Sequence, residues 1–116
     1  MMEFDGHWLT WGSIKYAARS GPWGNGTLPA GAYEVRVKEA VVNLTESGYV
    51  GDDGDGWFIP IVGDTPGRGG FGIHPDGGVE GTLGCIGLVG EAAAEFWRRW
   101  DACPMGDRPT GLEVWQ

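Results

Sequence analysis

Glycine interrupts this chain so often that few long regular elements fit between one glycine and the next. There are 23 glycines in 116 residues, and most stand between short apolar runs. Glycine favours tight turns, because without a Cβ it adopts backbone conformations that other residues avoid. No Gly-x-y period is present, so a collagen helix is excluded. The distribution predicts a loop-rich, mostly β domain.

The length predicts a single domain over residues 1–116. Apolar and polar residues alternate in 32–42, the pattern of a half-buried strand. Pro60 places the apolar run around it near an edge of the sheet. We expect about five to seven short strands in all. Besides 32–42, they are expected within residues 3–12, 13–19, 57–62, 71–74, 85–89 and 112–116.

One α-helix is predicted at about residues 91–101. Glu91 stands in its first turn, Arg98 and Arg99 stand near its end, and Pro104 stops it. The expected fold class is therefore a small β-sandwich or barrel of short strands with one helix. Most tryptophans are expected in the core. Those assigned to it are Trp8, Trp57, Trp97 and Trp100.

The net charge of −8 argues against nucleic acid and anionic membranes as partners, because both require clustered cations. No apolar run approaches the ~18 residues of a membrane span, so we expect no membrane insertion. Residues 1–5 show neither a basic nor an apolar segment of a secretion signal. We expect synthesis in the cytoplasm without a signal peptide.

His74 and Cys85 are the candidate catalytic pair. A cysteine attacks as its thiolate, and a nearby histidine can take its proton and store the thiolate as an ion pair. The two residues are eleven positions apart, each at one end of a short apolar segment. Two adjacent strands connected by such a loop can bring the ring within ~3–4 Å of sulfur.

The residues around Cys85 suit acyl transfer. Gly84 precedes the cysteine and Gly87 follows it, which leaves the backbone N–H groups accessible to a developing oxyanion. Thr82 offers a hydroxyl to the substrate or to the loop. Taken alone, a cysteine is more often a small core residue, which is the interpretation we give Cys103. The spacing of His74 and Cys85 alone does not favour a catalytic role of the pair over a structural one.

A zinc site and a disulfide are two other possible uses of the cysteines. The two cysteines and two histidines lack the short ligand spacing of a zinc site. Cys85 and Cys103 could form one disulfide if the chain is exported, and this alternative stays open.

Residues 73–78 followed by 81–87 resemble the His…Ser/Thr-x-Gly-Cys motif of L,D-transpeptidase catalytic domains. They are most similar to a compact subgroup that includes type VI secretion antibacterial effectors. Segments 4–9, 18–21 and 25–33 are similar to that subgroup more weakly, so the resemblance covers residues 4 to about 90. The larger enzymes carry a histidine before the Gly-Cys pair and an arginine soon after it. Here the first place holds Leu83 and the second Gly87 or Leu88.

The resemblance implies acyl transfer on peptidoglycan tetrapeptide stems. Cys85 would attack the third residue of the stem, D-alanine would leave, and His74 would act as acid and then base. The second ring nitrogen of His74 would bond a backbone carbonyl. Water, a D-amino acid or a second stem would resolve the thioester, giving carboxypeptidase, exchange or cross-linking activity. No metal or organic cofactor is implied.

Ser20, Arg68 and Asp76 are the candidate substrate-binding residues, and Arg19 is a further candidate for the donor carboxylate. Asp76 could instead only shape the turn after His74. We expect a monomer that acts in the periplasm or cell wall after non-classical delivery. An antibacterial effector would need an immunity protein and secretion machinery. A phage wall enzyme and a muropeptide-recycling enzyme are the other contexts.

Two alternatives come from other classes of protein. Residues 82–85 resemble the cysteine segment of sortases, but only His7 could serve as their far-upstream histidine, and the nearest downstream arginines are Arg98 and Arg99. A non-catalytic glycan-binding β domain is the second alternative, because seven tryptophans could provide stacking surfaces for sugars.

Overall fold

The computed structural model describes residues 1–24, 26–78 and 80–116. Two residues of the segments discussed above lie outside the described residues. They are Asn25, in the weakly similar segment 25–33, and Val79, in the loop between His74 and Cys85.

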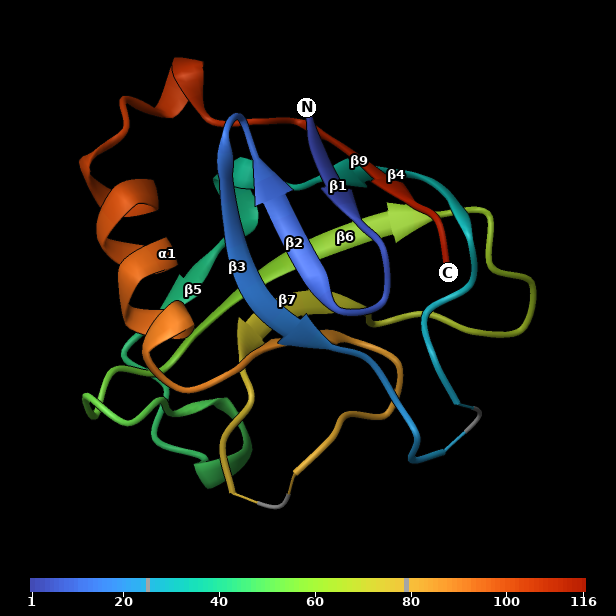
Figure 1. The fold of residues 1–116 in the computed structure, drawn as a ribbon, viewed down its shortest axis with the longest axis horizontal. Helices are drawn as coiled ribbons and strands as arrows, with labels where there is room; N and C mark the ends of the chain where they lie inside the picture. Colours follow the sequence, from blue (N-terminus) through green and yellow to red (C-terminus); the bar gives the residue numbers. More distant parts are fainter. Residues whose placement is uncertain (25, 79) are drawn as a thin grey trace.

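The described residues form a mostly β domain with one α-helix, as predicted, and eight strands close into a barrel. The barrel order is β4-β9-β1-β2-β3-β8-β7-β6, and β6 pairs back with β4. Figure 1 labels these strands except β8. A short ninth strand, β5, pairs with β6 outside the ring. Nine strands exceed the five to seven expected. Their bounds are β1 Met2–Phe4, β2 Trp8–Trp11, β3 Ile14–Arg19, β4 Gly31–Val35, β5 Val41–Val42, β6 Trp57–Gly63, β7 Gly72–Pro75, β8 Ile86–Leu88 and β9 Gly111–Val114.

The extra strands come from predicted segments that divide. Segment 3–12 turns at Gly6, which has a φ of 99°, and becomes β1 and β2. The Asp5 carboxylate accepts the His7 and Trp8 N–H groups at 2.9 and 2.8 Å within this turn. Segment 32–42 divides into β4, the 3-10 helix η1 (Val37–Glu39) and β5.

The placement of Pro60 at a sheet edge was wrong. Strand β6 is paired on both sides, with β7 on one side and with β5 and β4 on the other. Pro60 falls between the stretch that pairs with β5 and the stretch that pairs with β4. A residue without an N–H is tolerated where a strand changes partner.

The helix α1 spans Glu91–Ala102, as predicted, and covers the barrel beside β3 (Figure 1). Its Phe96 ring stacks with Trp57 and Trp100, with centroids 5.7 and 5.9 Å away. Trp97 is half-buried against this core. Placing Trp8 in the core was wrong, because Leu9 and Trp11 take the inward positions of β2 and the alternation turns Trp8 outward.

No helix in residues 1–24, 26–78 and 80–116 has both the length and the apolar character needed to span a bilayer. Three loops gather at the lower end of the barrel in Figure 1. They are the loop after β3, the loop around the 3-10 helix η2 (Ser47–Tyr49), and the loop between β7 and β8. A further 3-10 helix, η3, spans Met105–Asp107 and follows α1.

Candidate functional site

His74 lies on β7, and Cys85 directly precedes the adjacent strand β8, as the sequence predicted for two neighbouring segments. Strands β7 and β8 run parallel, with Ile73 opposite Ile86 and His74 opposite Gly87. Ile73 and Ile86 are fully buried in the core. Because side chains alternate along a strand, His74 lies on the opposite face, and so does Cys85, directly before Ile86. Both residues line one cavity.

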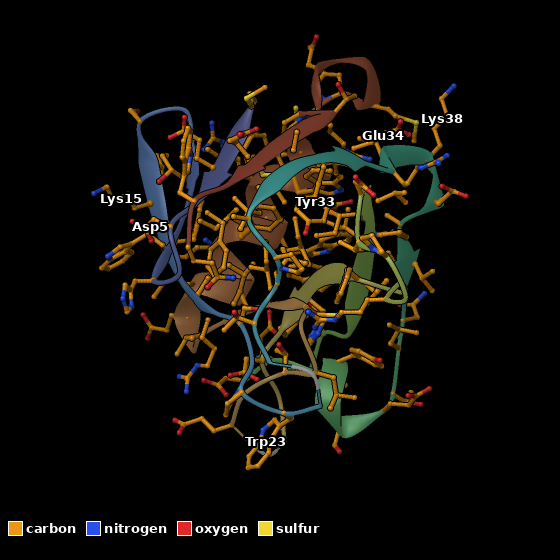
Figure 2. All side chains as sticks on the ribbon, turned by 90° about the vertical axis from the view of Figure 1, so that its right-hand side faces the viewer. Asp5, Lys15, Trp23, Tyr33, Glu34 and Lys38 are labelled. Atoms are coloured by element: carbon orange, nitrogen blue, oxygen red, sulfur yellow. The ribbon has the colours of Figure 1, made fainter. Side chains whose placement is uncertain are left out.

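The cavity has a volume of about 720 Å³ and lies at the end of the barrel where the three loops meet. Trp23 belongs to its rim, and Figure 2 shows this side chain at the lower tip of the molecule. The other lining residues are mostly glycine, aromatic or apolar. They include Tyr49, Gly69, Gly70, Phe71, Gly77, Gly81 and Leu83, together with Glu46, Ser47, Gly48 and Thr82.

The imidazole of His74 is held in one tautomer. Its Nδ1 lies 2.7 Å from the carbonyl oxygen of Pro75. A carbonyl only accepts, so Nδ1 carries the proton and Nε2 keeps its lone pair as a base. This is the backbone-carbonyl bond that the family resemblance implied.

Two aromatic rings fix the plane of the imidazole. The Tyr49 ring meets His74 edge-on, with centroids 4.8 Å apart at 89°, and Phe58 stacks against it at 5.9 Å and 15°. Burial lowers the pKa of His74, while the Pro75 carbonyl and the Asp76 charge act in the opposite direction. The resting imidazole is therefore favoured in its neutral form.

The thiol of Cys85 is half-buried, and its sulfur lies 3.9 Å from the Gly70 carbonyl oxygen. Burial raises the pKa of Cys85, and a backbone hydrogen bond from Gly72 partly opposes this. The raised pKa of the thiol and the lowered pKa of His74 both favour a neutral pair over the stored ion pair expected from sequence. Such a pair is suited to general-base transfer during attack.

Thr82 and Gly84 support the turn that presents Cys85. The Thr82 hydroxyl donates to the Cys85 carbonyl at 2.6 Å and accepts the N–H groups of Gly21 and Gly84 at 3.1 and 3.2 Å. The Gly84 N–H is thereby occupied and does not face an oxyanion. The Cys85 N–H lies just before the β7–β8 ladder, which begins at Ile86.

Gly84 has a second role in packing. Its φ is +126°, and a Cβ there would lie 2.6 Å from the Arg68 guanidinium and 2.7 Å from the Phe71 ring. Arg68 stands over the Phe71 ring at 4.9 Å and donates to the Thr27 carbonyl at 3.2 Å. Arg68 thus ties three loops together behind Cys85.

Ser20 also supports the loops. Its hydroxyl donates to the Gly84 carbonyl at 3.1 Å and accepts the Leu28 N–H at 2.9 Å. The loop after β3 is joined in this way to the turn before Cys85.

Asp76 is paired within the protein. Its carboxylate lies 3.0 Å from Arg19 and accepts the Gly81 N–H at 3.2 Å, and its side chain is 3% exposed. Neither Ser20, Arg68 nor Asp76 lines the cavity. The structure places these three candidate substrate-binding residues in the shell that holds the loops.

Sequence reasoning missed several residues of the site. Tyr49 and Phe58 gave no signal, because they lie in other segments and meet His74 only in the folded barrel. Gly72, inside a predicted strand, was a usable signal, since glycine in a strand often marks a close approach. A Cβ on Gly72 would collide with the Phe58 ring. Glu46 is the one Asp or Glu side chain among the described lining residues.

In the described parts of the chain, no three His, Cys, Asp or Glu side chains converge as metal ligands would. Neither a protein-family model nor a curated protein matches this chain.

Proposed function

We propose that this chain is a cysteine acyl transferase of the L,D-transpeptidase type, acting on peptidoglycan tetrapeptide stems. One observation carries the proposal. His74 on β7 and Cys85 directly before the adjacent parallel strand β8 lie on the same face and line the same cavity, and the imidazole is held with Nε2 as its base. The resemblance of residues 73–78 and 81–87 supplies the substrate class.

The first half-reaction forms a thioester. Cys85 sulfur attacks the carbonyl carbon of the third stem residue, and its proton passes to His74 Nε2. The oxyanion that develops accepts a hydrogen bond from the Cys85 N–H, which lies just before the β7–β8 ladder. The tetrahedral adduct collapses, the C–N bond to D-alanine breaks, and the imidazolium protonates the leaving amine.

The second half-reaction uses the same base. Nε2 removes a proton from water, from the amine of a D-amino acid or from the amine of a second stem. The oxygen or nitrogen attacks the thioester carbon, the C–S bond breaks, and the thiolate regains its proton from the imidazolium. The product is a shortened stem, an exchanged stem or a 3–3 cross-link.

The surroundings of Arg99 favour this proposal over a sortase-like enzyme. A sortase requires an arginine at the site. Arg99 donates to the Trp11 carbonyl at 2.7 Å and stands 3.8 Å over the Trp11 ring. Arg98 and Arg99 lie outside the cavity lining.

The test is incubation of the purified chain with a disaccharide tetrapeptide, with or without an added D-amino acid. We expect release or exchange of D-alanine and a thioester adduct visible in the intact mass. Cys85→Ala should abolish both, and Cys103→Ser is the matched control that should retain them. Intact muropeptides with no adduct would overturn the proposal. Retention of glycan by Cys85→Ala without turnover by wild type would favour the glycan-binding alternative.

The same proposal places the activity in the periplasm or cell wall. Wild-type chain directed to the periplasm should cause swelling or lysis, whereas Cys85→Ala should not. Equal toxicity of the two proteins would contradict an acyl-transfer role there. An immunity protein and a secretion machine are the partners that an effector role would add.

A further inference from the structure

The cavity beside Cys85 carries an unbalanced negative charge. Of the described residues that line it, Glu46 is the one carboxylate, and none is Lys or Arg. Trp23 and Leu83, two apolar residues of the same lining, are 48% and 70% exposed. The Glu46 side chain is also exposed, so it can meet a ligand that enters the cavity.

Two arginines of the shell that holds the loops, Arg19 and Arg68, are committed to other partners. Arg19 lies 3.0 Å from Asp76 and 3.0 Å from Glu80. The Arg68 guanidinium is committed to the Phe71 ring and to the carbonyls of the loop after β3. Within residues 1–24, 26–78 and 80–116, the Glu46 carboxylate makes no ion pair or hydrogen bond.

Glu46 is fixed relative to the catalytic base. The Tyr49 N–H donates to its backbone carbonyl at 2.9 Å, and the Tyr49 ring lies edge-on to His74. The carbonyl of Ser47 packs so closely on Gly77 that any Cβ there would collide with it. The loop that carries Glu46 is therefore part of the wall around His74.

We propose that Glu46 is a specificity residue that binds a primary ammonium of the substrate, namely the side-chain ammonium of a diamino acid at the attacked position. This inference rests on the proposed function. A carboxylate and an ammonium form a charge-assisted hydrogen bond, whereas the carboxylates of a stem peptide are repelled at this wall. An amine acceptor is a second source of the same ammonium chemistry, and the test separates the two.

The test compares two tetrapeptide donors that differ in one charge, with L-lysine or Nε-acetyl-L-lysine at the third position. Wild type should show a kcat/KM about tenfold higher for lysine, the size of a modest charge-assisted contact. Glu46→Gln should bring this ratio close to one. It should lower kcat/KM for the lysine donor and leave kcat/KM for the acetyl-lysine donor unchanged. Glu95→Gln changes an exposed glutamate on α1 outside the cavity and should leave the ratio unchanged.

The hydrolysis reaction, measured without an amine acceptor, shows whether Glu46 binds the ammonium of the donor or that of the acceptor. An effect of Glu46→Gln on hydrolysis of the lysine donor supports the donor ammonium. An effect confined to reactions with an added D-amino acid would overturn the proposal in favour of the acceptor. An equal loss of kcat/KM for both donors, with a shifted pH profile, would show that Glu46 acts through His74. This result would overturn the proposal.

A failure of the Glu46 proposal can be distinguished from a failure of the proposed function. A wild type that processes both donors equally overturns the role of Glu46 and leaves the proposed function standing. A wild type that processes neither donor and forms no thioester overturns both.

Discussion

The Thr82 hydroxyl donates to the Cys85 carbonyl at 2.6 Å. The same oxygen accepts the N–H groups of Gly21 and Gly84, so one side chain joins the turn before the nucleophile to the loop after β3. Thr82 is 5% exposed, which shields these bonds from water. The direction in which Cys85 enters the cavity is thereby set by a residue that does not react.

Replacement of Thr82 tests this arrangement. Thr82→Val keeps the shape but leaves two buried N–H groups without an acceptor, so we expect a loss of about 2–4 kcal/mol in the free energy of unfolding. Thr82→Ser keeps the hydroxyl and should lose about 1 kcal/mol. Urea denaturation measures both. Equal stability of the two variants would contradict the role of the hydroxyl.

Alkylation of Cys85 should report a neutral resting thiol. Burial raises the pKa of this thiol above the ordinary value of 9.0. In a Cys103→Ser background, the rate with iodoacetamide should therefore increase roughly tenfold per pH unit up to and beyond pH 9, because only the thiolate reacts. A rate that levels off below pH 7 would indicate a preformed ion pair instead.

Protonation of His74 should weaken the fold. Burial lowers its pKa below the ordinary 6.5, so the unfolded chain binds this proton more readily than the folded chain. The free energy of unfolding should be constant with respect to this group above about pH 6.5 and should fall as pH drops through the folded pKa. Denaturation of wild type and His74→Gln across this range measures the effect. A His74→Gln variant that keeps the wild-type slope would contradict this prediction.

The local features of the candidate site were predictable from the sequence. Strand periodicity placed His74 and Cys85 at the ends of apolar segments, and the loop between them predicted two adjacent strands. The parallel direction of these strands was not predicted. The helix was equally visible, because its signals are local: an acidic first turn, a basic last turn and a following proline.

Contacts between distant segments were not predictable in the same way. Thr82 was expected to offer its hydroxyl to the substrate or to the loop, yet its partner Gly21 is 61 residues away and was not predictable. Arg68 and Asp76 were candidate substrate-binding residues on the basis of the sequence. Their actual partners, Thr27 and Arg19, are brought near only by the closed barrel. Single-sequence patterns do not encode which loops meet at its end.

The final prediction concerns Gly72, the residue that makes room for the aromatic support of the base. A Cβ there would collide with the Phe58 ring, which stacks on His74 at 5.9 Å. Gly72→Ala should therefore push this ring aside, costing about 1–3 kcal/mol in unfolding free energy. It should also lower turnover, because the imidazole loses one of its two supporting rings.

Two comparisons make this prediction specific. Gly106→Ala is the matched control, since nothing lies within 4 Å of a Cβ at that position, and it should leave stability and turnover near wild type. The double variant Gly72→Ala/Phe58→Leu removes the ring that collides, so it should regain part of the lost stability while turnover stays low. A double variant that loses the sum of both single effects would show that the two residues do not interact, and the steric account of Gly72 would fail.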